Sequence, residues 1–276
     1  KVGIITFTDG DNYGQRLQNL AVQEIIKELK LEPYTIRQNK GLRKRLKIAK
    51  QFINSILNGT WIANFKRHSA FKRFDNTYIN YYHKRISEKN MNRFPEHEFS
   101  FFVTGSDQIW SPYSDDVNAT MFLRFTSKYK RISFVPSMAA EEIPYDLRDT
   151  YKEYLTGFKW LSIRETKGAQ LIYALVGRKP EVLIDPTLMF NCDFWEKYET
   201  KPIWLKEPEF LLFYFLGSRD SCEFVDELKA KYCCPIIDLL DDKRYRVSGP
   251  SEFLYLIHHS KLVVTDSYHG SIFSIL

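Results

Sequence analysis

The sequence VGIITFTDGDNYGQRLQNLAVQEIIKELKLEPYTI, residues 2–36, places this chain in the α/β class. An apolar run over residues 2–8 is typical of a buried strand, and the Gly- and Asn-containing turn that follows ends it. Residues 34–36 begin a second strand. Between the two strands, apolar residues recur at helical spacing on one face: Leu17, Leu20, Ala21, Ile25 and Leu29. A strand–helix–strand unit predicts a parallel sheet, with the turn at the carboxyl end of the first strand.

The alternation of strands and helices returns near residue 99 and continues to the end of the sequence. Further strands are expected at 99–103, 131–135, 160–163, 210–216, 235–240 and 262–264. We predict one α/β domain over residues 1–200, with a basic helical insertion at about 37–95, and a second over 205–276. Because about three strands make a small and open sheet, we expect the second domain to be truncated at its C-terminus.

Composition excludes several other classes of protein. The chain is 44% hydrophobic and 27% charged, which is the balance of a globular protein and not of a disordered one. The sequence holds no run of about 18 apolar residues, so we expect no membrane-spanning helix. Its four cysteines form no CxxC pair and have no histidine at metal-ligand spacing. This pattern favours neither a zinc module nor a disulfide scaffold, and it fits a reducing, cytoplasmic compartment.

The charge of the chain is unevenly distributed. The formal net charge is +6, but 15 Lys or Arg and only two acidic residues lie between Arg37 and Arg93, which gives that block +13. The remainder of the chain therefore carries −7. Such a block suits a polyanion, an anionic membrane surface or an acidic substrate, although a solvated helical face would have the same composition.

Four strand-to-helix turns carry polar, Gly-containing clusters. They lie at Asp9–Gly14, Gly105–Gln108, Arg164–Glu165 and Asp266–Gly270. Ligands bind open α/β sheets at such turns, where strand ends converge and helix N-termini offer free amides to anions. Caps and tight turns use the same residue types for purely structural reasons. The occurrence of four clusters at equivalent positions indicates a ligand-binding cleft.

His269 is the strongest single candidate for catalysis. It follows an apolar strand and precedes Gly270 at the start of a helix, where an imidazole can exchange protons beside a bound anion. Arg164 stands at the end of another strand, where its guanidinium can bind a carboxylate or a phosphate. Glu165 could orient that arginine or act as an acid or base. A packed histidine and a surface Arg–Glu pair are the competing interpretations.

No metal site is assigned from the sequence. The pairs Asp115-Asp116 and Asp241-Asp242 lie in loops without further ligands. Cys233-Cys234 has no nearby histidine in the sequence, and we interpret it as part of a core. We therefore expect no metal and no cofactor.

Five motifs, in this order, resemble the polysaccharide pyruvyl transferase family. They are Asn12-Tyr13-Gly14 with Leu17-Gln18, Gly105–Trp110, Ser162–Glu165, Asp185–Thr187 and Thr265–Gly270. Their order and spacing agree with the family across essentially the whole chain. The resemblance implies two Rossmann-like domains with a central cleft, the arrangement called GT-B, here with an incomplete second domain.

The resemblance also implies a reaction and a set of site residues. The family transfers a pyruvyl group from phosphoenolpyruvate, a co-substrate, to a sugar of a cell-surface polysaccharide such as an exopolysaccharide or a capsule. His269, Arg164 and Glu165 would be catalytic. The donor would be bound by Arg164, Asp185, Ser267, Gly270 and Ser271. The acceptor side would be lined by Asn12, Tyr13, Gly14, Gly105, Ser106, Asp107 and Gln108.

One departure from the family keeps a second function open. Some members have Arg where this chain has Ser267, and a hydroxyl cannot replace the charge of a guanidinium. The alternative is a GT-B glycosyltransferase that uses a nucleotide-sugar donor. A pure binding protein is a third possibility, but no nucleic-acid-binding motif is present. We expect a glycan or lipid-linked saccharide as acceptor, no nucleic acid, and peripheral contact of residues 42–57 with the inner, anionic face of the membrane.

Overall fold

The computed structural model of the chain describes residues 1–39, 42–114, 118–217 and 223–276. For residues 42–45, 47, 223, 224 and 226 it describes the backbone only. The Asp115-Asp116 pair therefore lies outside the described residues.

The chain is divided into two compact units, each built from separate segments. Unit 1 consists of residues 1–10, 15–39 and 78–189. Unit 2 consists of residues 11–14, 40–77 and 190–276. Both units combine helices with parallel strands, so the predicted α/β class is confirmed.

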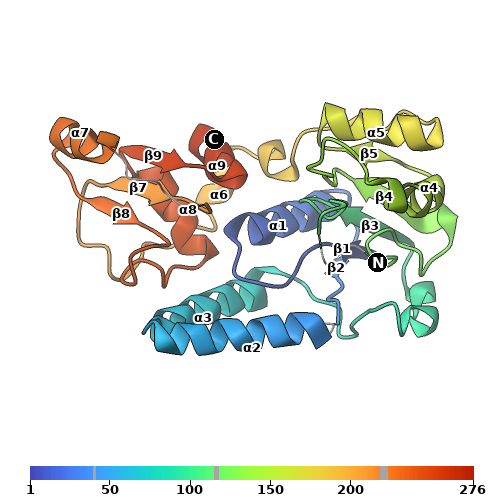
Figure 1. Cartoon of the computed structure of the whole chain (residues 1–276), viewed down its shortest axis with the longest axis horizontal. Coiled ribbons are helices and arrows are strands. Elements are labelled where there is room, and N and C mark those ends of the chain that lie inside the picture. The colour runs from blue at the N-terminus through green and yellow to red at the C-terminus, as the bar shows by residue number, and fades with distance from the viewer. Residues whose placement is uncertain (40–41, 115–117, 218–222) are drawn as a thin grey trace. The chain divides into compact units, whose positions relative to one another are not determined.

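The sheet of unit 1 contains four parallel strands in the order β2-β1-β3-β4 (Figure 1). These strands are β1 (Val2–Ile5), β2 (Pro33–Thr35), β3 (Phe101–Gly105) and β4 (Arg131–Phe134). Two further parallel strands, β5 (Ser162–Ile163) and β6 (Glu181–Val182), pair with each other. A bridge between Ile132 and Trp160 continues the parallel order from β4 towards β5. The predicted parallel sheet is thus confirmed.

Helices α1 (Tyr13–Glu28), α4 (Arg148–Thr156) and α5 (Thr166–Val176) accompany these strands. Short 3₁₀ helices lie at Met91–Arg93, Glu96–Glu98, Lys128–Lys130, Tyr145–Leu147 and Pro186–Met189. The buried face of α1 is shifted relative to the prediction: Val22 and Ile26 are buried, whereas Leu29 is 66% exposed. Leu29 was wrongly placed on this face because α1 ends at Glu28, one residue before it.

The two faces of the four-stranded sheet carry different parts of the core. Val2 and Ile4 point to one face, where they pack with Val22, Ile26 and Val103. The neighbouring residues Ile5 and Phe102 belong to a larger, aromatic-rich cluster. Alternation along a strand sends successive side chains to opposite faces, so both faces of this sheet are apolar and buried.

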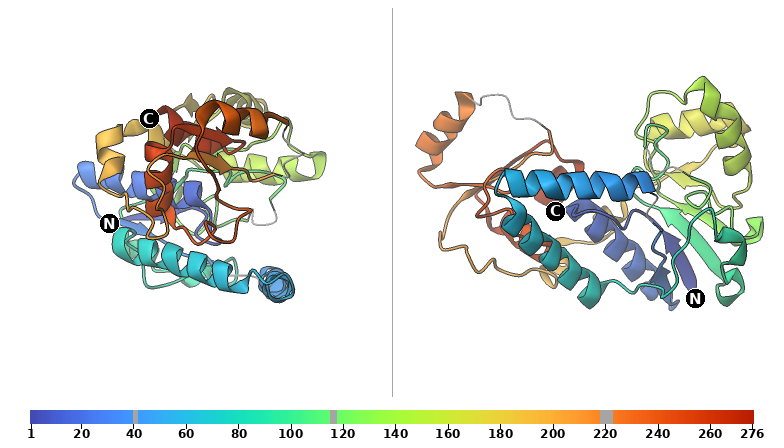
Figure 2. Two further views of the ribbon diagram at one scale, coloured as in Figure 1. Left: turned by 90° about the vertical axis from the view of Figure 1, so that its left-hand side faces the viewer. Right: turned by 60° about the horizontal axis from the view of Figure 1, so that its bottom comes forward.

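Unit 2 contains a three-stranded parallel sheet in the order β8-β7-β9. Its strands are β7 (Leu211–Tyr214), β8 (Ile236–Asp238) and β9 (Leu262–Thr265). Helices α6 (Cys192–Glu196), α7 (Glu223–Tyr232), α8 (Pro250–His259) and α9 (Tyr268–Ile275) come from the C-terminal part of the chain. The helices predicted in the basic block are present as α2 (Leu42–Leu57) and α3 (Trp61–Tyr78), which follow each other closely in the chain (Figure 2).

An aromatic cluster forms the centre of unit 2. The ring of Tyr13 stacks on Phe253 of α8 with 4.3 Å between centroids, and it also packs against Phe71 of α3 and Tyr214 of β7. The cluster therefore joins the turn at 11–14 to three elements of the unit. In the described part of the chain, no helix combines the length and the hydropathy needed to cross a bilayer.

Candidate functional site

Unit 1 holds a buried polar network at the carboxyl ends of its strands. The carboxylate of Asp185 is fully buried and accepts an ion-paired hydrogen bond from Arg164 at 2.7 Å. Its Oδ2 also lies 3.3 Å from Ser106 Oγ, and its Oδ1 accepts from the hydroxyl and the amide of Thr187. The structure thus brings together Ser106, Arg164 and Asp185, three predicted site residues that lie far apart in the sequence.

Glu165 contacts a different part of the same edge. Its Oε1 accepts hydrogen bonds from the amides of Met138, at 2.7 Å, and Ala139, at 3.3 Å. Its Oε2 is buried, and among the described residues no hydrogen-bond partner reaches it. The loop it holds contains two left-handed residues, Val135 with φ 56° and Ala139 with φ 46°. Such backbone strain is maintained only where the surrounding contacts enforce it, and it clusters at functional sites.

In the Gly105–Gln108 segment, the first two residues are buried in the fold and the last two reach solvent. Gly105 has φ 156°, and a Cβ added there would lie 1.8 Å from the carbonyl oxygen of Phe134, so glycine is needed for the close approach of β3 and β4. Ser106 is buried, and its amide donates to Gln18 Oε1 at 3.2 Å. Only Asp107 and Gln108 reach solvent. These two side chains are therefore the part of the segment available to a ligand.

In unit 2, His269 lies in the first turn of α9 and is 8% exposed. Its ring rests against the backbone of Gly14: a Cβ at Gly14 would be 2.2 Å from His269 Nδ1. Glycine at this position thus makes room for the imidazole. The Asn12-Tyr13-Gly14 turn and the Thr265–Gly270 segment are therefore in contact.

The N-terminus of α9 is already capped. Ser267 Oγ accepts a hydrogen bond from the Gly270 amide at 3.2 Å, and the Ser267 carbonyl accepts from the Ser271 amide at 2.9 Å. Asp266 accepts from the amides of Leu216 and Gly217 at 2.7 and 2.8 Å. An anion bound by the Gly270 amide would therefore have to displace the serine hydroxyl that caps the helix.

Tyr13 is a packing residue. Its ring is fully buried, and its hydroxyl donates to the Ser248 carbonyl at 3.0 Å while Arg67 donates to the same hydroxyl. Burial raises the pKa of Tyr13 to about 12, although the charge of Arg67 opposes this rise. The phenol is thus neutral and enclosed, whereas its neighbour Asn12 faces a cavity.

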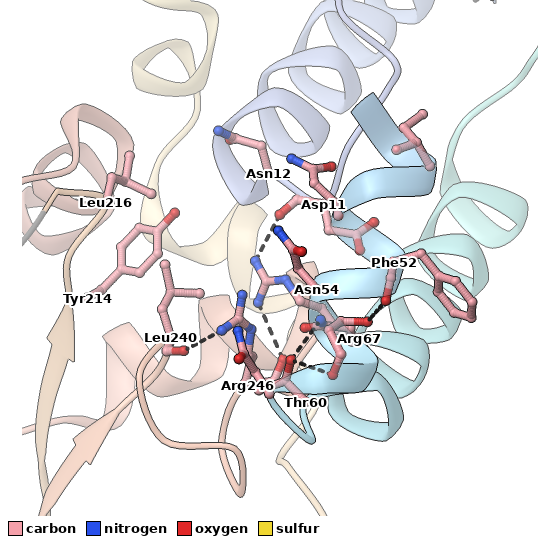
Figure 3. A pocket seen from close by; sticks show the side chains of 15 residues that line it. Asp11, Asn12, Phe52, Asn54, Thr60, Arg67, Tyr214, Leu216, Leu240 and Arg246 are labelled. Atoms are coloured by element: carbon pink, nitrogen blue, oxygen red, sulfur yellow. Dashed lines mark hydrogen bonds between the residues drawn. The ribbon is translucent and has the colours of Figure 1, made fainter. Parts of the chain in front are cut away.

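That cavity has a volume of about 670 Å³ and lies entirely in unit 2 (Figure 3). Its wall is rich in carboxamides, which can both donate and accept hydrogen bonds. These are the side chains of Asn12, Gln51, Asn54, Asn58 and Asn64. Apolar side chains of Ile48 and Phe52 line another part of the wall. A cavity of this size with a mixed lining is typical of a small-molecule site.

Two arginines and one acidic residue, Asp11, line this cavity, so its wall carries a net positive charge. Arg67 is 6% exposed and donates to the Asp11 carbonyl at 2.8 Å. Arg246 donates to the Leu240 carbonyl at 3.2 Å, and its Nε is buried without a hydrogen-bond partner among the described residues. Within that part of the chain, neither guanidinium forms an ion pair with a carboxylate. The cavity therefore suits a hydroxyl-rich ligand that carries a negative charge.

This cavity was not predicted from the sequence. Gln51 and Asn54 on α2 and Asn58 directly after it recur at helical spacing, which is a pattern that could have indicated the cavity. Arg67 and Arg246 are 179 residues apart, and only the fold brings them together.

The pair of Arg164 and Asp185 allows a direct test of the unit 1 network. Arg164→Met leaves the buried carboxylate of Asp185 without its cationic partner, which we expect to cost about 3–5 kcal/mol in free energy of unfolding. The measurement is urea denaturation followed by circular dichroism. The matched control is Glu24→Gln, which breaks the exposed pair with Lys27 and should cost less than about 1 kcal/mol. Equal losses in the two variants would contradict the structural role of the buried pair.

Comparison with known proteins identifies the family of this chain. A comparison with curated proteins finds no match. The family model of polysaccharide pyruvyl transferase matches residues 12–276, which include the Asn12–Gly14 turn, the buried Arg164–Asp185 pair and His269. Because the match spans essentially the whole chain, this protein belongs to the polysaccharide pyruvyl transferase family.

Proposed function

We propose that this protein transfers a pyruvyl group from phosphoenolpyruvate to two hydroxyls of a sugar in a surface polysaccharide, which forms a cyclic ketal. The observation that carries the proposal is the family match over essentially the whole chain. We further propose that the two units correspond to the Rossmann-like domains of a GT-B fold.

The proposed reaction is balanced without an oxidant or a metal. One acceptor hydroxyl bonds to C2 of phosphoenolpyruvate, and the methylene carbon takes up a proton and becomes a methyl group. Phosphate then leaves C2 as its C–O bond breaks, and the second hydroxyl closes the ring at the same carbon. Of the two hydroxyl protons, one ends on the methyl group and the other leaves with phosphate. The enzyme must therefore move protons and bind an anionic donor.

The site residues can be given matching roles. His269 would protonate the methylene carbon, because an imidazolium can act as a general acid and this side chain lies at the start of α9. Arg164 would bind the carboxylate or the phosphate of the donor while Asp185 fixes its orientation. Glu165, with one buried oxygen that lacks a described partner, would serve as a second acid or base.

The cavity of unit 2 would hold the acceptor. Its carboxamides suit the hydroxyls of a saccharide, and Arg67 and Arg246 suit an acidic group on that saccharide or on its lipid carrier. Of the residues predicted for the acceptor side, Asn12 lines this cavity, whereas Gly105, Ser106, Asp107 and Gln108 belong to unit 1.

Helices α2 and α3 would bring the protein to the membrane. Large apolar side chains on them are exposed instead of buried, as at Leu57 (78%), Phe65 (68%) and Phe52 (59%). The others are Leu46, Ile48, Ile53, Ile56, Trp61 and Ile62. Exposed apolar residues within a segment of charge +13 fit an interfacial helix pair on an anionic leaflet. We propose peripheral attachment at the inner face of the membrane, where a lipid-linked acceptor would be found.

The donor and His269 are tested by phosphate release. With phosphoenolpyruvate and a panel of glycan acceptors, His269→Gln should lower kcat by about 10²–10⁴-fold, because general acid catalysis is lost. His97→Gln, which changes an exposed histidine of unit 1, should leave kcat unchanged. Undiminished activity of His269→Gln would contradict the assignment of His269 as the general acid.

The identity of the donor is tested by thermal melts with added ligands. Thermal stabilisation by nucleoside diphosphates but not by phosphoenolpyruvate would favour a glycosyltransferase.

The acceptor cavity is tested by a pair of asparagines. Asn54→Ala removes a carboxamide from the cavity wall, and we expect the KM for the acceptor to rise about 5–30-fold, in line with one or two lost hydrogen bonds. The KM for phosphoenolpyruvate should not change. Asn76→Ala, on α3 but outside the cavity lining, is the control and should have neither effect. A change confined to the phosphoenolpyruvate KM would show that the cavity binds the donor.

The membrane role is tested by flotation with liposomes. We expect recovery on vesicles containing phosphatidylglycerol but not on neutral phosphatidylcholine vesicles, because the basic segment needs anionic lipid. The double variant Leu57→Ser/Phe65→Ser should lose most of this recovery, since each burial in the interface contributes about 1.5–3 kcal/mol. Ile203→Ser, at a fully exposed apolar residue outside α2 and α3, is the matched control. Equal recovery on both kinds of vesicle would contradict the proposal.

A further inference from the structure

Three potential metal ligands of unit 2 converge where α6 lies beside α8. Cys192 and Glu196 are one helical turn apart on α6, and His258 lies on α8. Cys192 Sγ is 3.8 Å from Glu196 Oε1 and 3.9 Å from His258 Nε2. His258 Nε2 is 3.8 Å from Glu196 Oε1, so the three donor atoms of Cys192, Glu196 and His258 form a triangle. All three donor atoms are therefore almost equidistant.

These distances match the requirements of zinc. Zn–S bonds of about 2.3 Å and Zn–N or Zn–O bonds of about 2.0–2.2 Å, at tetrahedral angles, place the ligand atoms about 3.3–3.6 Å apart. The observed triangle is only slightly larger, and a contraction of a few tenths of an ångström would close it. A thiolate and an imidazole favour Zn²⁺ over Mg²⁺ or Ca²⁺, which prefer sets of oxygen ligands.

A fourth residue orients the histidine. Glu199 Oε1 lies 2.8 Å from His258 Nδ1, so this ring nitrogen carries the proton and Nε2 presents its lone pair to the triangle. The other carboxylate oxygen, Oε2, lies 3.2 Å from His259 Nε2. A carboxylate on the distal nitrogen of a ligating histidine is the usual second contact at zinc sites, where it fixes the tautomer and raises the basicity of the ligand.

Local structure holds the triangle in place. Asn191 caps α6 by accepting a hydrogen bond from the Phe194 amide at 3.1 Å, which fixes Cys192 in the first turn. The Thr200 amide donates to the carbonyl of Ser251 at 3.1 Å and so ties the segment after α6 to α8. Trp195, between the two α6 ligands, is buried. The ligands thus project from anchored backbone and not from a free loop.

We propose that Cys192, Glu196 and His258 bind a Zn²⁺ ion, with water as the fourth ligand and Glu199 as the residue that positions His258. The thiol of Cys192 loses its proton to solvent when the ion binds, and the other two ligands bind through lone pairs they already hold. Glu196 and His258 are 50% and 37% exposed as side chains, so the ion can enter from solvent. Bound zinc would clip α6 to α8 and thereby stabilise unit 2.

The proposal is independent of pyruvyl transfer, and it differs from the sequence-based expectation of no metal. The i, i+4 spacing of Cys192 and Glu196 was visible in the sequence. The third ligand follows only after 62 further residues, which is far outside the spacing of short zinc motifs.

Cobalt and zinc titrations of the full chain, first stripped with a chelator, test the site. Co²⁺ should give thiolate-to-metal charge-transfer absorption and the visible bands of a tetrahedral ion at one equivalent, and Zn²⁺ should bleach both. Saturating Zn²⁺ should raise the Tm of the chain. Cys192→Ser should abolish the charge-transfer band, and Cys192→Ser and His258→Gln should each lower zinc affinity at least 10-fold. Glu199→Gln should weaken zinc binding by about 10–100-fold while the band is kept.

Cys233→Ser provides the matched control, because this thiol lies outside the triangle and is exposed, so the interpretation of Cys233 as a core residue was wrong. This variant should bind both metals as the parent chain does. Circular dichroism of each variant shows whether its fold is retained. Absence of the charge-transfer band in the parent chain, its persistence in Cys192→Ser or its loss in Cys233→Ser would overturn the proposal.

Discussion

The burial of one ring, that of Tyr13, is the constraint on which unit 2 depends. The ring stacks on Phe253, and its hydroxyl is held by the Ser248 carbonyl and Arg67. Because the hydroxyl has both a donor and an acceptor partner, the ring can be fully buried without an unsatisfied polar group. This anchoring fixes the residues on either side of Tyr13. Asn12 faces the cavity, and Gly14 receives the ring of His269.

Unit 1 is organised around a buried charge. Asp185 is enclosed, and its two oxygens accept hydrogen bonds from Arg164, Ser106 and Thr187. A buried carboxylate is tolerated only when it is paired and hydrogen-bonded. The same contacts that satisfy Asp185 also hold the guanidinium of Arg164 at the carboxyl ends of the strands.

Much of the fold could be predicted from residue patterns. The strands β1 and β3, the helices α1 and α2, and the parallel sheet of unit 1 follow from periodicity and from turn chemistry. The prediction at Leu29 was wrong because periodicity alone does not reveal that α1 ends at Glu28. The ordered motifs indicated the family correctly.

The amino-acid order alone was sufficient for the α/β class, the basic block and the location of polar turns at strand ends. These properties are local, because they depend on spacing within a few residues. Which turns share a unit, and which polar residues face each other, depended on long-range packing. Segments 11–14 and 40–77 group with residues 190–276, and this grouping creates the cavity with Arg67 and Arg246. The convergence of Cys192, Glu196 and His258 has the same origin: contacts between distant segments arise from burial of apolar surface, which sequence spacing does not encode.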